Sequence, residues 1–169
     1  MWGRDEREFR EFVEARLPTM RRSAYLLCGD VHEADDVVSV ALAKLFRHWR
    51  RVSHMEHPDA YVRRILLTTY LDERRRPWRQ ERLVESVPEP VPPPESDVLD
   101  RMTLLGLLAR LSPRRRAVLV LRFFEDLSIE QTAEALQCAT GTVKAHTHQG
   151  LAELRAMLGQ RAPALLEEP

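Results

Sequence analysis

The sequence predicts an all-α protein made of two small helical domains joined by a proline-rich, acidic linker, with a helix-turn-helix in the C-terminal domain. Apolar residues recur at helical spacing on both sides of the chain's middle and nowhere alternate cleanly as in a strand. The middle holds five of the eleven prolines, and a short helix, a turn and a longer helix are predicted after it. We therefore expect domains at residues 1–82 and 100–160, with a linker at 83–99.

Length and composition restrict the classes of function. With 169 residues, 44% of them hydrophobic, the chain is globular but too short for an enzyme-sized barrel or doubly wound sheet. It shows no basic leader with an apolar core and no apolar run that would span a bilayer, so we expect a cytoplasmic protein without membrane insertion. Cys28 and Cys138 stand apart from any cysteine or histidine cluster, which predicts packed side chains and no metal, cofactor or redox role.

Charge is distributed unevenly along the chain. The formal net charge is zero, but segments 1–80 and 101–169 are mildly basic and the acidic segment 81–100 offsets them. The overall charge therefore does not exclude a nucleic-acid partner for either flanking domain.

The N-terminal domain is predicted to consist of amphipathic helices. Gly29 with the acidic "GDVHEADD" segment, and the "SHMEHPDA" segment around Pro58, mark the breaks between them. We expect one helix from Glu33 to Trp49 and another from Asp59 to about Arg76. The apolar residues at helical spacing form four stripes: Phe9, Phe12, Val13 and Leu17; Met20, Ala24 and Leu27; Val37, Val38, Ala41, Leu42, Leu45, Phe46 and Trp49; and Ala60, Val62, Ile65, Leu66, Thr69 and Tyr70.

The second of these helices combines positive charge with aromatic side chains. Arginines neutralise phosphates and aromatic rings stack on unpaired bases, so the combination is typical of a surface that holds an opened DNA strand. A solvated face of a helix bundle is the alternative that the charge pattern leaves open. The residues concerned are Arg63, Arg64, Arg74, Arg75, Arg76 and Arg79, with Tyr61, Tyr70 and Trp78.

The linker sequence "ERLVESVPEPVPPPESDVLD" extends from Glu81 to Asp100. Proline at this density excludes a helix and favours an extended polyproline form. The two flanking domains are therefore expected to be separate and joined by a semi-rigid tether.

Helix-start signals follow the linker. Ser112 before Pro113 predicts an N-cap with proline at the first helical position, where its missing N–H costs nothing. Ser128 and Gln131 have the spacing of a capping box, which predicts a short helix from Ile129 to Leu136.

The stretch "TGTVKAHTHQGLAELR", from Thr140 to Arg155, predicts the second helix of a helix-turn-helix. Its front half has poor helix propensity, but Val143, Leu151, Leu154 and Leu158 form one apolar stripe. In a helix-turn-helix the front of this helix meets base edges in the major groove, which favours short and hydrogen-bonding side chains. A capped helix pair in a bundle is the alternative that spacing alone leaves open. The candidate DNA contacts are Thr140, Thr142, Lys144, Ala145, His146 and His148.

Two blocks of the sequence resemble a known family. "LSPRRRAVLVLRFFEDLSIEQTAEALQCATGTVKAHTHQGLAELR" is similar to the promoter-binding C-terminal domain of bacterial extracytoplasmic-function sigma factors. "DVHEADDVVSVALAKLFRHW" and "HPDAYVRRILLTTYLDERRR" are similar to the N-terminal domain of the same family. The resemblance covers about residues 9–80 and 100–158 in the family's order, and the phrase "PDAYVRRIL" is similar to actinobacterial, sigma-E-like members.

The resemblance implies a subunit that binds core RNA polymerase, directs it to promoters and helps to melt them, with no enzymatic activity and no small-molecule substrate. It implies the polymerase β and β′ subunits, promoter DNA and an anti-sigma factor as partners. The implied polymerase-binding residues are Asp35, Asp36, Ser39, Leu42 and Phe46, although about half of Val38, Leu42, Leu45 and Phe46 are expected to be core. The implied minus-ten contacts are Ser53, His54, Met55, Glu56, Tyr61, Arg63, Arg64, Thr68, Arg74, Arg75 and Arg76. The implied minus-thirty-five contacts are Arg114, Arg115, Thr140, Thr142, Lys144, Ala145, His146, His148 and Gln149.

The sequence departs from the family's pattern at several of these positions. Thr68 stands where an asparagine is common, Gln137 where the turn usually has glycine, and Ala139 where a capping serine is usual. His146 and Gln149 stand where arginines are common. Because an arginine contact to guanine contributes roughly 1 to 3 kcal/mol of discrimination, we expect a weaker or differently tuned minus-thirty-five contact.

Other classes of function fit the sequence less well. A transcriptional regulator that uses the helix-turn-helix without joining the polymerase is the main alternative, and an interaction module whose DNA surface has decayed is a third. An enzyme would have to start from the acidic "HEADD" segment with His54 and His57, but their spacing matches no metal site and acids are expected at a helix start.

Overall fold

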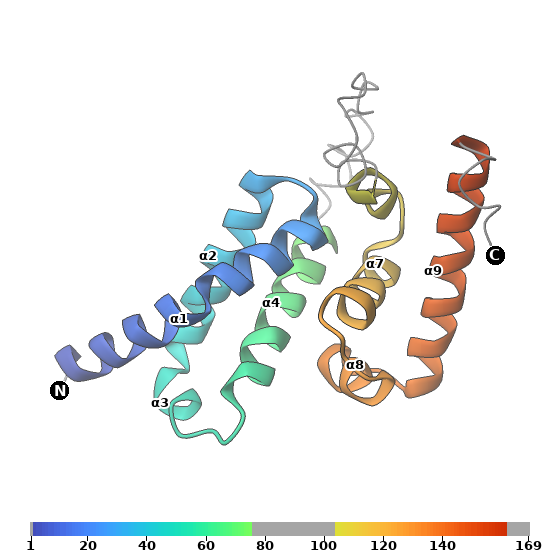
Figure 1. Cartoon of the computed structure of the whole chain (residues 1–169). Helices are drawn as coiled ribbons and strands as arrows, with labels where there is room; N and C mark the ends of the chain where they lie inside the picture. The colour runs from blue at the N-terminus through green and yellow to red at the C-terminus, as the bar shows by residue number, and fades with distance from the viewer. Residues whose placement is uncertain (1, 76–103, 162–169) are drawn as a thin grey trace. The chain divides into compact units, whose positions relative to one another are not determined.

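The computed structural model describes residues 2–75 and 104–161, and the regular elements in these ranges are all helices (Figure 1). The all-α prediction is confirmed. The chain divides into two compact units, Met1–Ser86 and Val87–Pro169. The predicted linker at 83–99 lies outside the described residues. Within the described ranges, no helix is long and apolar enough to cross a membrane.

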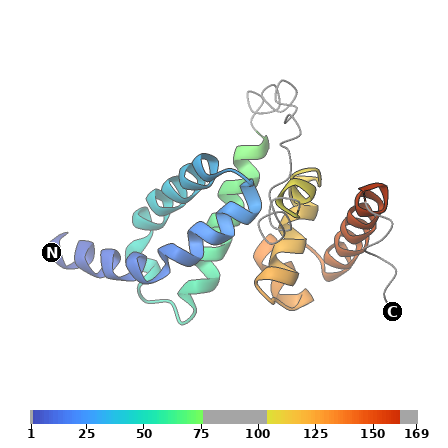
Figure 2. The ribbon, with the colours of Figure 1, turned by 45° about the horizontal axis from the view of Figure 1, so that its top comes forward.

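The described part of the N-terminal unit contains three long helices and one short helix: α1 (Trp2–Cys28), α2 (Val31–Arg47), α3 (Trp49–Val52) and α4 (Pro58–Arg75). The long helices α1, α2 and α4 pack against one another, as Figures 1 and 2 both show. Burial of their apolar faces is the main stabilising contribution, because each large side chain removed from water contributes about 1.5 to 3 kcal/mol. The core is formed by Ala24, Leu27, Val37, Ala41, Leu45, Val52, Leu66, Leu67 and Tyr70.

The first two predicted apolar stripes belong to one continuous helix, α1, which passes through Pro18. A proline in a helix interior removes a backbone hydrogen bond and costs about 3 kcal/mol. Packing on both sides of Pro18 offsets this cost. The rings of Phe12 and Trp49 lie 5.0 Å apart on one side, and Ala24 and Leu27 are buried on the other.

The predicted breaks between helices are confirmed, with small shifts in their bounds. Gly29 ends α1 with φ 73° and donates its N–H to the Tyr25 carbonyl at 2.7 Å, a left-handed conformation that suits glycine. The Asp30 carboxylate then caps α2 by accepting from the Glu33 N–H at 2.9 Å. The helix ends at Arg47, so Trp49, predicted to finish it, is buried in α3 instead.

The C-terminal unit contains the predicted helix-turn-helix. Residues 104–109 are helical and precede α7 (Pro113–Leu119), the π-helical turn η1 (Val120–Phe124), α8 (Ile129–Leu136) and α9 (Thr140–Arg161). Ser112 caps α7, and the predicted capping box of Ser128 and Gln131 opens α8. Between α8 and α9 the chain turns through Gln137 with φ 52°. A residue other than glycine thus occupies a left-handed position.

The predicted apolar stripe fixes α9 in its unit. Val143 is fully buried, and Leu151 and Leu154 pack against a cluster formed by Leu108, Leu111 and Leu119. Gly150 permits this packing, because a Cβ added there would lie 3.0 Å from a Leu119 methyl carbon. Tertiary contact therefore supports a helix whose own propensity is low.

Candidate nucleic-acid and polymerase interfaces

The front of α9 presents short and polar side chains on the face opposite its core contacts. Burial of Val143 and Gly150 sets the orientation of the helix. The side chains of Thr140, Lys144, Ala145, His148 and Gln149 are exposed, while Thr142 and His146 are half-buried. This surface offers one cationic group and several hydrogen-bonding groups at a helix N-terminus, where phosphate and base edges are accommodated.

Arg115 of α7 is held against α9. Its guanidinium donates to the Glu153 carboxylate and, at 2.9 Å, to the Gln149 carbonyl oxygen Oε1. The neighbouring Arg114 is exposed and makes no hydrogen bond or ion pair with the described residues. The two arginines predicted as DNA contacts therefore differ: among the described residues, Arg115 is paired and Arg114 is not.

His146 lies near these arginines in a partly desolvated position. Burial, followed by the charges of Arg115 and Arg114, lowers the pKa of His146 below the 6.5 of a free imidazole. The side chain is therefore mainly neutral at pH 7. Its Nδ1 is buried and has no hydrogen-bond partner in the part of the chain that the structure describes.

In the N-terminal unit, α4 carries an exposed stripe that includes Arg64, Thr68 and Arg75. Their spacing of four and seven residues places them on one side of the helix. Tyr61 and Arg63 are half-buried beside this stripe, and the Thr68 hydroxyl donates to the Arg64 carbonyl at 2.7 Å.

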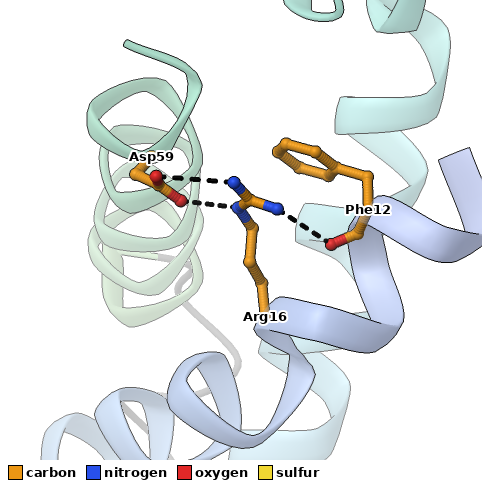
Figure 3. Close-up of polar contacts among 3 residues, drawn as sticks. All are labelled: Phe12, Arg16 and Asp59. Atoms are coloured by element: carbon orange, nitrogen blue, oxygen red, sulfur yellow. Dashed lines mark hydrogen bonds and ion pairs between the residues drawn. The ribbon is translucent and has the colours of Figure 1, made fainter. Parts of the chain in front are cut away.

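The start of α4 is fixed to α1 by a paired arginine. Arg16 donates from Nε to one Asp59 oxygen at 2.5 Å and from Nη2 to the other at 3.4 Å, while Nη1 donates to the Phe12 carbonyl at 3.3 Å (Figure 3). Its guanidinium also lies 3.7 Å from the centre of the Phe12 ring. The pairing neutralises Asp59 beside the 53–57 loop, so this carboxylate repels an approaching phosphate less.

The loop between α3 and α4 carries Ser53, His54 and Glu56 as exposed side chains and Met55 as a half-buried one. The His54 Nδ1 lies 2.7 Å from the Arg50 carbonyl oxygen and 3.1 Å from the Ser53 hydroxyl. These contacts shape the loop from within.

Comparisons with known proteins agree for both units. Residues 12–80 match the family described as Sigma-70 region 2, and residues 101–154 match Sigma-70, region 4. The RNA polymerase sigma-E factor of Streptomyces coelicolor is 38% identical over 160 residues, covering 91% of this chain and 88% of that protein. The ECF RNA polymerase sigma factor SigL of Mycobacterium tuberculosis is 31% identical over 156 residues, covering 88% of each.

The chain belongs to the ECF RNA polymerase sigma factors. Among solved structures, the chain is similar to the sigma factor RpoE of Bartonella quintana in complex with the anti-sigma factor NepR. The TM-score is 0.70 at 22% identity, and the match covers 92% of this chain and 99% of that one. CnrH, in complex with the cytosolic domain of CnrY, has a TM-score of 0.62. These likenesses support the fold. Sigma factors of this class act in transcription initiation and are not enzymes.

In this sigma factor the predicted polymerase-binding residues lie on the outer face of α2. Asp35, Asp36 and Ser39 are exposed, Leu42 is half-buried, and Phe46 is 44% exposed with its ring 5.0 Å from Phe9. As expected, half of the four apolar candidates are core, namely Val38 and Leu45. The sequence did not single out Val31 and Val40, which are exposed. Their only signal in the sequence is that they are apolar residues outside the apolar stripe of α2.

Two α4 residues of the sigma factor have roles different from those predicted. The sequence predicts Tyr70 both in an apolar stripe and as an aromatic side chain for DNA. It is 2% exposed and belongs to the core, so only the stripe is confirmed. Arg74 was placed among the minus-ten contacts, but its Nη2 donates to the Cys28 carbonyl and to Glu33, each at 3.1 Å, and its side chain is 13% exposed. Arg74 therefore connects α4 to the α1–α2 turn. Arg76, Trp78 and Arg79 lie outside the described residues.

Proposed function

We propose that the sigma factor uses three surfaces: the outer face of α2 for core RNA polymerase, the 53–57 loop with α4 for the minus-ten element, and the front of α9 for the minus-thirty-five element. Two features of the same chain carry this proposal. The front of α9 exposes short and polar side chains while Val143 beneath them is buried, and α4 exposes arginines. The first surface suits a protein partner and the other two suit DNA.

The proposed polymerase surface consists of Asp35, Asp36, Ser39, Leu42 and Phe46, to which we add Val40. Carboxylates beside partly exposed apolar side chains fit a basic partner surface with an apolar centre. The β and β′ subunits of core polymerase are the proposed partners. An anti-sigma factor is a further proposed partner, and the similar RpoE of Bartonella quintana is itself in complex with the anti-sigma factor NepR.

The proposed minus-ten surface consists of the 53–57 loop with Tyr61, Arg63, Arg64, Thr68 and Arg75. Each arginine that neutralises a phosphate releases about 0.7 to 0.9 counterions and makes binding more sensitive to salt. The polar loop offers groups for an unpaired base. Arg74 is omitted because its guanidinium serves the fold.

The proposed minus-thirty-five surface consists of Arg114, Thr140, Thr142, Lys144, Ala145, His146, His148 and Gln149. His146 is mainly neutral at pH 7, so it contributes a hydrogen bond more than a charge. This composition fits moderate affinity for the upstream element. The domains are proposed to extend over 1–82 and 100–160 with the linker at 83–99, and the protein is proposed to act in the cytoplasm.

The experiment that tests this function is transcription in vitro from a pool of genomic promoter fragments, using the full chain and sigma-free core polymerase. Sequencing of transcript starts should reveal discrete starts with two shared upstream elements. The absence of starts, together with no binding to core polymerase, would contradict the proposal and favour a stand-alone helix-turn-helix regulator. Variants of Asp35 and Asp36 should weaken assembly with core, and variants of Lys144 and His148 should weaken promoter use after normal assembly.

A further inference from the structure

A chain of three side chains connects α7 to the exposed face of α9. Arg115 donates through Nη1 to Glu153 and through Nη2 to Gln149 Oε1 at 2.9 Å. Glu153 and Gln149 lie one helical turn apart on α9, so one planar guanidinium bridges both. The Arg115 side chain is 30% exposed, and its Nε is buried without a hydrogen-bond partner among the described residues. Its position is therefore set by the two contacts with α9.

The direction of these hydrogen bonds fixes the Gln149 amide. Arginine has only donors, so the Gln149 atom that faces Arg115 must be the carbonyl oxygen. The amide Nε2, with two N–H groups, remains available on an exposed side chain. An unrestrained glutamine in the major groove pairs with adenine through both Oε1 and Nε2. Engagement of Oε1 by Arg115 disfavours that pairing and leaves Gln149 mainly a donor.

We propose that Arg115, held by Glu153, is a positioning residue that makes Gln149 a hydrogen-bond donor to an acceptor of promoter DNA. The acceptor is the O6 and N7 edge of guanine or a backbone phosphate oxygen, both of which accept only. This inference rests on the proposed function, because it requires α9 to lie on DNA. It assigns Arg115 a role through Gln149 and not as a direct cationic contact.

Arg114 provides a matched control. It precedes Arg115 in α7 and carries the same charge, but it has no polar contact with the described residues. Because the Arg115 guanidinium is engaged by Glu153 and Gln149, loss of Arg115 should lower the salt slope of DNA binding less than loss of an arginine that neutralises a phosphate. Loss of Arg114 should lower the salt slope if that arginine meets a phosphate.

The test uses holoenzyme assembled from core polymerase and the full chain, bound to a promoter from the transcription experiment whose upstream element is randomised. Bound DNA is sequenced for Gln149→Ala, Arg115→Met, the double variant, Arg115→Lys, and Arg114→Met with and without Gln149→Ala. We expect Gln149→Ala to lower occupancy of the best sequence roughly 5- to 150-fold, as for one lost base contact. Arg115→Met should cause a similar loss and move the preference at one position toward adenine. The double variant should bind no worse than Gln149→Ala.

Arg115→Lys keeps one donor to Gln149 and should restore part of the preference. The losses of occupancy caused by Arg114→Met and by Gln149→Ala should be independent, so the fold-loss of the double variant should equal the product of the two single fold-losses. A coupled loss that is equal for all sequences would support a phosphate acceptor instead of guanine. Independent effects of Arg115→Met and Gln149→Ala, or wild-type binding by Gln149→Ala, would overturn the inference. A wild-type holoenzyme that starts no transcription would overturn the proposed function, and this result appears before any variant is compared.

Discussion

Separate replacement of Arg74 and Arg75 by alanine distinguishes an arginine that stabilises the fold from one proposed to bind DNA. Arg74 donates to the Cys28 carbonyl and to Glu33 at 3.1 Å, and its guanidinium lies 5.5 Å from the centre of the buried Tyr70 ring. Arg75, the last residue of α4, is exposed. The two variants remove the same charge from adjacent positions, so a difference between them reports on the contacts.

The expected loss of stability for Arg74→Ala follows from these contacts. A hydrogen bond from a charged donor contributes about 1.5 to 3 kcal/mol, and the ion pair adds under about 1 kcal/mol because Glu33 is 36% exposed. The buried Arg74 Nε has no hydrogen-bond partner among the described residues, which reduces the net contribution. We expect a loss of about 2 kcal/mol, or roughly 8 to 16 °C in Tm for a domain of this size. Arg75→Ala should stay within about 0.5 kcal/mol of wild type.

The assay combines calorimetry of the full chain with promoter binding by the assembled holoenzyme across a salt series. Arg75→Ala should keep the Tm and lower the salt slope by about one, as for one lost phosphate contact. Arg74→Ala should lower the Tm and keep the slope at a temperature where it is folded. Equal Tm values for the two variants, or an unchanged Tm with a lower slope for Arg74→Ala, would refute this reasoning.

Three further predictions concern the C-terminal unit. Gly141→Ala should stabilise the unit by up to about 1 kcal/mol, because a Cβ at this position meets nothing within 4 Å. Gly150→Ala should leave stability unchanged or lower it by up to about 2 kcal/mol, because its Cβ would press against Leu119. Equal gains in Tm for the two variants would contradict this prediction. Gln137→Gly should raise stability by about 0.5 to 1 kcal/mol, because φ is 52° there, and calorimetry showing a loss would count against it. The lowered pKa of His146 means that the unfolded chain binds more protons than the folded chain below about pH 6.5, so the free energy of unfolding should fall as pH decreases through that range. The free energy of unfolding of the His146→Gln variant should fall less over the same range. Parallel pH profiles for the two proteins would disprove the effect.

Local signals in the sequence determined the helical class, the helix starts and much of the core. Ser112, Ser128 with Gln131, and Gly29 act through their own backbone neighbourhood, so their caps and turns were predictable from a few residues. Val143 was predictable as core because burial follows the helical period.

Tertiary structure decided which polar residues are available to partners. Arg74 and Arg75 are equivalent in composition, but only Arg74 reaches the α1–α2 turn, 41 and 46 residues away in sequence. Arg115 likewise meets Glu153 and Gln149 only because α7 packs against α9. Helical period places a side chain on a face but does not specify which distant helix covers that face. The sequence by itself therefore determined the helical class, the capped helix starts and the family resemblance. The packing of distant helices decided which arginines stabilise the fold and which remain for DNA.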